Sequence, residues 1–129
     1  MLACGGLLDT CAAIRAGLVP IWGCDTAELP RQLWQDLTNS PCYGDAFKLN
    51  IQSLRKPTVL KSGFPCQDYS GLGSELGGQG KSGNLYAEQA KLILQISPAV
   101  AIIEQTDNAI NINHGKEVKQ LISDLQQDY

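Results

Sequence analysis

The side chains with the most reactive chemistry in this 129-residue chain follow its apolar runs, and Cys66 leads them. It stands between Pro65 and Gln67, shortly after the apolar run 58–60. A thiol held by a rigid proline at the start of a loop is expected to be exposed in a cleft, as a nucleophile must be. The competing interpretation is a small apolar side chain that fills a turn, which is commoner for a cysteine taken at random. Cys66 is therefore a candidate nucleophile whose assignment depends on its neighbours.

Glu104 ends the most apolar run of the chain, residues 99–103. A carboxylate at that place is expected to be partly withdrawn from water, which favours its protonated form and suits a proton donor. The alternative is a strand-end side chain that points into solvent. Because Cys66 follows a neighbouring strand, the two side chains could face one pocket.

Glycines and carboxylates follow the first three apolar runs in the same way. Gly5 and Gly6 would let a ligand approach the backbone closely, although two such glycines are more often only a turn. Asp25 and Asp45 follow the next two runs, where nucleotide-binding sheets place an acidic residue that accepts hydrogen bonds from ribose hydroxyls. Each could equally be a helix N-cap. Three such features, one for each successive strand, together favour a nucleotide site.

The elements that must position these residues alternate along the chain. Helical patterns cover 7–16, which ends at Gly17, then 27–37 with Thr26 as a possible cap, 85–96, and a last helix with apolar residues from 118 to 125. Short strands are expected at 19–23, 41–44, 58–60 and 99–103, and one or two helical turns within 47–54. Residues 63–83 hold seven glycines and are expected to form a long functional loop.

Apolar strands that alternate with helices predict the α/β class: a Rossmann-like, mostly parallel sheet with helices on both faces. Ligands of such sheets bind at the carboxyl ends of the strands, which is where the candidate residues fall. A hydrophobic content of 43% with two Phe and two Trp suits one compact core, so a single domain over residues 1–129 is expected.

The bulk composition limits the partners and the compartment. A net charge of −3 argues against a chain that binds nucleic acid by itself. No run approaches the ~18 apolar residues of a membrane span, and no signal peptide is recognisable, so a cytosolic or nuclear compartment is expected. Five widely spaced cysteines without a C-x-x-C pair, and a single histidine, predict neither a disulfide framework nor a structural zinc site.

At these residues the sequence resembles the cytosine-5 DNA methyltransferase family. The run Pro65-Cys66-Gln67, followed by Tyr69-Ser70 and Gly73, looks like the family's Pro-Cys-Gln-x-Phe/Tyr-Ser-x-x-Gly motif and is the most specific signal in the chain. Further stretches match other family motifs in the same order: 22–25 and 44–45 the second and third cofactor motifs, 83–86 the return to a helix after the catalytic loop, and 98–106 the strand ending in Glu-Asn-Val. The resemblance covers essentially the whole chain.

The resemblance implies a partial class I methyltransferase fold, S-adenosylmethionine as the methyl donor, and DNA methylation of the kind found in restriction–modification systems. Cys66 would add to C6 of a cytosine flipped out of the duplex, and Glu104 would hydrogen-bond and protonate N3. Gln67 and Ser70 would order the loop over the flipped base. The implied cofactor residues are Asp25 at the ribose, Asp45 at the adenine, Gly5 and Gly6 at the methionine part, and Thr26, Ala46 and Pro65 beside them.

The chain departs from the family pattern at several places. The first strand is very short, Leu7-Leu8 stand where Gly-Gly is usual, Lys81 takes the place of the Asp-x-Arg stretch, and Gln105-Thr106 replace Asn-Val. The family continues with a Gln-x-Arg-x-Arg strand and a target-recognition domain that are not in these 129 residues. These departures are compatible with a fragment, with a subunit that works with a C-terminal partner chain, or with a reduced relative. They are also compatible with a relative acting on transfer RNA and with a non-catalytic binding or regulatory module.

Overall fold

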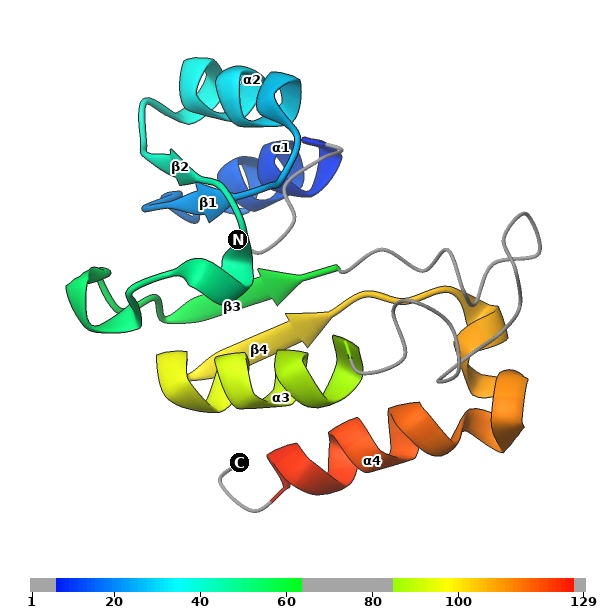
Figure 1. Cartoon of the computed structure of the whole chain (residues 1–129). Coiled ribbons are helices and arrows are strands. Elements are labelled where there is room, and N and C mark those ends of the chain that lie inside the picture. The colour runs from blue at the N-terminus through cyan, green and yellow to red at the C-terminus, as the bar shows by residue number, and fades with distance from the viewer. Residues whose placement is uncertain (1–6, 64–84, 127–129) are drawn as a thin grey trace. The chain divides into compact units, whose positions relative to one another are not determined.

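The computed structural model describes residues 7–63 and 85–126. In chain order its helices and strands are α1 (Leu8–Arg15), β1 (Gly23–Cys24), α2 (Glu28–Thr38), β2 (Cys42–Tyr43), β3 (Val59–Ser62), α3 (Leu85–Ile96), β4 (Val100–Ile103) and α4 (Lys116–Leu125) (Figure 1). The short 3-10 turns η1 (Ala46–Lys48) and η2 (Ile51–Ser53) follow β2, and η4 (Asp107–Ile110) and η5 (Ile112–Gly115) follow β4. The described residues fall into two compact units, one within Met1–Gly63 and Pro98–Ile102, the other within Phe64–Ser97 and Ile103–Tyr129.

The first unit contains a parallel pair of strands covered by α2. β1 and β2 run parallel, with Gly23 opposite Cys42 and Cys24 opposite Tyr43. Trp34 of α2 packs on this pair and is 1% exposed. A Cβ built on Gly23 would come within 2.9 Å of Cε2 of the Trp34 ring, so only glycine admits the ring this close to the strand.

Two hydrogen bonds between residues distant in sequence hold other parts of this unit together. The indole nitrogen of Trp34 donates to Oγ1 of Thr10 in α1 at 3.1 Å. The indole nitrogen of Trp22 donates to the carbonyl of Arg55, ahead of β3, at 2.7 Å. Both bonds satisfy polar atoms of large, buried side chains, which would be costly to leave unpaired.

β3 and β4 form a second two-stranded sheet, and their arrows point the same way in Figure 1. The amide of Val100 donates to the carbonyl of Thr58 at 3.0 Å. Leu60 and Ser62 of β3 are buried, whereas Val100 and Ile102 of β4 are 49% and 50% exposed. Alternate residues of β4 thus face solvent, although the run is apolar throughout.

The second unit is built around α3 and α4, which pack on each other. Its buried cluster joins both helices and the turn between β4 and α4, with Ile103, Val118 and Leu125 packed against it; the cluster residues are Tyr86, Ala90, Ala109 and Leu121. Residues 118, 121 and 125 recur at helical spacing, as the sequence predicts, and Leu121 is the buried one among them.

The α/β class and the Rossmann-like pairing of parallel strands are confirmed, and two local expectations are wrong. Strand β1 is shorter than 19–23, because Pro20 has no N–H to offer a ladder and Val19 is 81% exposed. Thr26 does not cap α2: the N-cap residue is Ala27, and its amide donates to Oδ1 of Asp25 at 2.9 Å. The single-domain expectation stays a prediction.

Candidate cofactor and catalytic site

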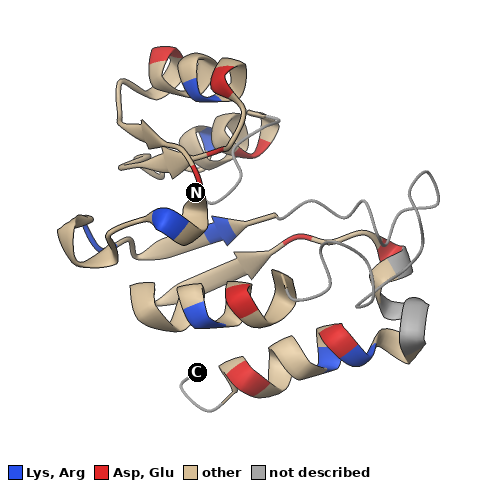
Figure 2. Cartoon of the chain, viewed as in Figure 1, with Lys and Arg blue, Asp and Glu red and all other residues tan. Residues whose placement is uncertain are grey.

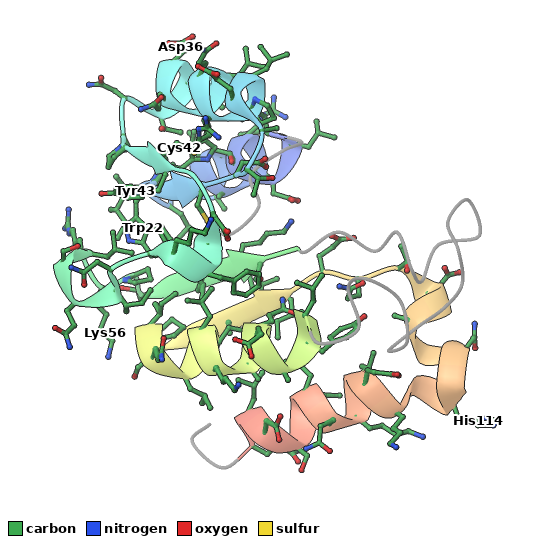
Figure 3. All side chains as sticks on the ribbon, viewed as in Figure 1. Trp22, Asp36, Cys42, Tyr43, Lys56 and His114 are labelled. Carbon is green, nitrogen blue, oxygen red and sulfur yellow. The ribbon has the colours of Figure 1, made fainter. Side chains whose placement is uncertain are left out.

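Asp25 and Asp45 lie at the same edge of the β1–β2 pair. The amide of Asp25 donates to the carbonyl of Tyr43 at 3.0 Å, which extends the parallel ladder by one step beyond β1. Asp45 follows β2 at the same end, two residues after Tyr43, whose side chain marks that strand in Figure 3. The register of the two strands therefore brings both carboxylates to one carboxyl edge, as the sequence predicts for a ligand site.

Each of the two carboxylates also holds the turn that follows its strand. Oδ1 of Asp25 accepts the amide of Ala27 at 2.9 Å, and Oδ1 of Asp45 accepts the amide of Phe47 at 3.0 Å. Asp45 is the N-cap of η1, so the capping interpretation of that residue is realised. A carboxylate has about four lone-pair sites, so one bond through Oδ1 leaves Oδ2 able to accept from a ligand.

This edge of the β1–β2 pair is partly open to solvent. Asp25 and Asp45 are partly exposed, and a Cβ built on Gly44 would meet nothing within 4 Å, so the edge is open where a ligand would enter. Thr26 is exposed beside Asp25, and Ala46 is buried at the start of η1. The carboxylates of Asp25 and Asp45 can accept hydrogen bonds from hydroxyl and amino groups.

Arg31 was not singled out from the sequence, yet it belongs to this edge. Its Nη1 donates to the carbonyls of Asp25 and Thr26 at 2.9 and 2.8 Å. The signal that could have identified it is its place in the first turns of a helix that follows a strand-end carboxylate, where an arginine can reach back to the preceding loop.

Glu104 directly follows β4 and belongs to the second unit. Its side chain is exposed, so the expected partial withdrawal from water is not found, and the alternative of a strand-end side chain pointing into solvent is realised. The physical reason lies in β4 itself, where the alternate residues Val100 and Ile102 are exposed and provide no apolar cover. An exposed carboxyl remains accessible to an incoming base.

Six of the predicted site residues lie outside the described part of the chain: Gly5, Gly6, Pro65, Cys66, Gln67 and Ser70. Of the remaining ones, the structure brings Asp25, Thr26, Asp45 and Ala46 to one edge of the first unit. Over residues 7–63 and 85–126 there is no group of three His, Cys, Asp or Glu side chains that could hold a metal ion. The helices within those ranges are all too short or too polar to cross a membrane.

Comparison with known proteins identifies the family of this chain. Residues 4–128 match the model of the C-5 cytosine-specific DNA methylase family. The chain is 32% identical over 108 residues to the type II methyltransferase M.BbvI of Brevibacillus brevis, covering 81% of this chain and 28% of that protein. It is 26% identical over 126 residues to the type II methyltransferase M.NgoFVII of Neisseria gonorrhoeae, covering 95% of this chain and 33% of that protein. The chain thus spans a third or less of the length of these curated relatives.

Parallel strands alternating with helices, and carboxylates at their carboxyl edge, define part of a Rossmann-like methyltransferase fold. Because the family model matches nearly all of its residues, the chain belongs to the C-5 cytosine-specific DNA methylase family.

Proposed function

We propose that this chain carries the catalytic and cofactor-binding part of an enzyme that methylates C5 of cytosine in DNA through a covalent adduct with Cys66. The match of residues 4–128 to the family supports this proposal more than any other observation. The placement of Asp25 and Asp45 at one open edge supports the cofactor half of it independently. DNA is the proposed partner, and a target-recognition portion is proposed to act with this chain, as further sequence or as a separate C-terminal partner chain.

The chain's own residues have distinct tasks in the proposed reaction. The Cys66 thiolate forms a bond to C6 of the cytosine, which moves an electron pair toward C5. Glu104 gives a proton to N3 and so neutralises the charge that would otherwise build up on the ring. After C5 has gained the methyl group and lost its proton, the bond between Cys66 and C6 breaks and N3 returns its proton to Glu104. Gln67 and Ser70 are proposed to order the loop beside the base.

S-adenosylmethionine, when bound, supplies a methyl group on a positively charged sulfur. In the proposed arrangement Asp25 accepts hydrogen bonds from the ribose hydroxyls, and Asp45 accepts from the adenine amino group. Gly5, Gly6, Thr26, Ala46 and Pro65 are proposed to line the same subsite. Both aspartates already accept one backbone amide through Oδ1, so their carboxylates are held in place before a ligand arrives.

A covalent trap tests the proposal. Duplex DNA that contains 5-fluorocytosine is incubated with the chain and S-adenosylmethionine, with and without the C-terminal portion of a type II relative. Because fluorine at C5 cannot leave as a proton does, the bond to Cys66 should persist and appear as a protein–DNA band under denaturing conditions. Peptide mass spectrometry should locate the bond at Cys66.

Matched variants make this trap specific. Cys66→Ser should abolish the band, whereas Cys11→Ser should not, although Cys11 is an exposed free thiol that would react if trapping were indiscriminate. Glu104→Gln should slow adduct formation by about 10²–10⁴-fold, the usual contribution of a general acid. If no adduct forms even with the supplied portion, the proposed reaction through Cys66 is wrong for this chain. An adduct with transfer RNA but not with DNA would replace DNA by RNA as the substrate.

A further inference from the structure

Arg31 ties the helix α2 back to the strand end that carries Asp25. A single nitrogen, Nη1, donates to the carbonyl of Asp25 at 2.9 Å and to the carbonyl of Thr26 at 2.8 Å. Bonds from a charged guanidinium are stronger than those between neutral groups. The turn between β1 and α2 is therefore held at two consecutive carbonyls by one side chain.

This contact governs where the Asp25 carboxylate can lie. The only other side-chain bond from the described residues to this turn joins Oδ1 of Asp25 to the amide of Ala27 at 2.9 Å. That bond fixes the carboxylate relative to its own turn but does not fix the turn relative to the helix. The bond from the Asp25 amide to the Tyr43 carbonyl holds the start of the turn to β2. Arg31 adds a constraint between the turn and α2, and α2 in turn packs on β1 through Trp34 and Gly23.

The guanidinium fixes the turn without neutralising the carboxylate. Within the described part of the chain no Lys or Arg nitrogen lies within 4.0 Å of the Asp25 carboxylate, whereas Nζ of Lys48 lies 3.7 Å from Oδ2 of Asp45. Arg31 donates to backbone carbonyl oxygens and not to the carboxylate. Oδ2 of Asp25 can therefore still accept a hydrogen bond from a neutral hydroxyl. An acceptor that is both held and uncompensated suits a ribose, whose hydroxyls are donors.

We propose that Arg31 is the positioning residue of the ribose subsite and that it sets the preference of this site for a nucleoside with free ribose hydroxyls. The proposal rests on the proposed binding of S-adenosylmethionine beside Asp25. Arg31 itself touches no ligand group in this arrangement and acts through Asp25 and Thr26. Its effect should therefore appear as selectivity between ligands as well as in their affinity.

The test compares two ligands on the same chain by calorimetric titration: S-adenosylhomocysteine and an analogue that lacks both ribose hydroxyls. For the unaltered chain the analogue should bind about tenfold more weakly, the value of a charge-assisted hydrogen bond. Arg31→Met keeps the stem and the helix propensity but removes the donors. It should weaken the binding of S-adenosylhomocysteine about three- to tenfold while hardly changing that of the analogue, so that the ratio of the two Kd values falls to about three or less.

Two further variants separate positioning from general damage. Arg31→Lys retains one charged donor and should recover part of the selectivity, and it decides the question if Arg31→Met does not fold. Arg15→Met removes the same charge from the exposed end of α1 and should leave both affinities unchanged. A loss of affinity that is equal for both ligands, or no loss at all in either Arg31 variant, would overturn the role of Arg31.

Asp25→Ala distinguishes this failure from that of the proposed function. If Asp25→Ala weakens the binding of S-adenosylhomocysteine but the Arg31 variants keep the selectivity between the two ligands, only the proposed role of Arg31 is wrong. If the unaltered chain binds no S-adenosylhomocysteine, or if Asp25→Ala leaves its Kd unchanged, the cofactor site and the role of Arg31 are both wrong.

Discussion

Asp25 and Asp45 each hold the turn that follows their strand through one carboxylate oxygen, Oδ1. The sequence offered helix capping and ribose binding as alternatives for these residues, and the structure makes the two compatible. Oδ1 accepts the amide two residues ahead in both cases, at 2.9 and 3.0 Å. A carboxylate that already caps a turn has lost most of its rotational freedom, so less entropy remains to be lost when a ligand binds.

Gly23 offers the sharpest test at the scale of one residue. A Cβ there would lie 2.9 Å from Cε2 and 3.1 Å from Cδ2 of Trp34. The ring cannot move aside, because it is buried and its nitrogen is bonded to Thr10. We therefore expect Gly23→Ala to lower the free energy of unfolding by about 1–3 kcal/mol, as overpacking does. Urea denaturation followed by tryptophan fluorescence measures this change.

Gly44→Ala is the matched control for Gly23→Ala. A Cβ at Gly44 would meet nothing within 4 Å, and its φ is not positive. Its effect should stay within about 0.5 kcal/mol, as for ordinary surface substitutions. Equal effects of the two substitutions would contradict the close packing of Trp34 on β1.

At the scale of elements, the helices of the second unit owe their stability to one apolar face. α4 has Leu121 at 3% exposure, in the cluster with Tyr86, Ala90 and Ala109, and the next residue, Ile122, at 50% exposure. A helix of ten residues is marginal by itself in water, so this face must be what keeps α4 folded.

We expect Leu121→Ala to destabilise the chain by about 2–5 kcal/mol, because it removes buried methyl groups and leaves a cavity. Ile122→Ala is the control on the same helix and should cost less than about 1 kcal/mol, since half of that side chain is already in water. Thermal unfolding followed by far-ultraviolet circular dichroism, which reports helix content, compares the two variants at equal protein concentration. A cost for Ile122→Ala as large as that for Leu121→Ala would mean that α4 packs through another face.

At the scale of the whole molecule, the balance of charge bears on the proposed binding of DNA. It has 10 Lys and Arg against 13 Asp and Glu. The described helices carry both signs, as the blue and red segments of α4 show in Figure 2. A hollow beside α4 is lined by His114, Lys116 and Lys119, but Glu117 and Asp124 lie on the same helix. Such mixing leaves no extended basic face in these helices to follow a phosphate backbone.

The chain alone is therefore expected to bind duplex DNA with a Kd weaker than about 100 µM at physiological salt, the weak end of non-specific binding. Fluorescence anisotropy of labelled DNA, at low and at physiological salt, measures this. Addition of the C-terminal portion of a type II relative should tighten binding and steepen the dependence on salt. Binding of the chain alone below about 1 µM would show that it carries its own DNA-facing surface.

Several elements could be predicted because their signals are local. α3 has the predicted bounds, Leu85–Ile96, and α1 ends before Gly17, which adopts a φ of 82° as a helix-terminating glycine does. The alternation of strands and helices predicted the α/β class. The ends of the expected strands predicted that Asp25 and Asp45 lie at the edge of a sheet. Periodicity and backbone preferences act over a few residues, so one sequence is sufficient to reveal them.

The other features of the fold depend on contacts between residues distant in sequence, which no local sequence pattern predicts. The sequence by itself determined that carboxylates follow the strands; the parallel register of β1 and β2 brought two of them to one edge. The apolar run before Glu104 predicted partial burial of its carboxylate, which is wrong, because the exposure of a strand-end side chain depends on which elements pack nearby. The bonds of Arg31 to the turn before α2 and the close approach of Trp34 to Gly23 were decided by tertiary structure too, because both follow from how α2 lies on β1.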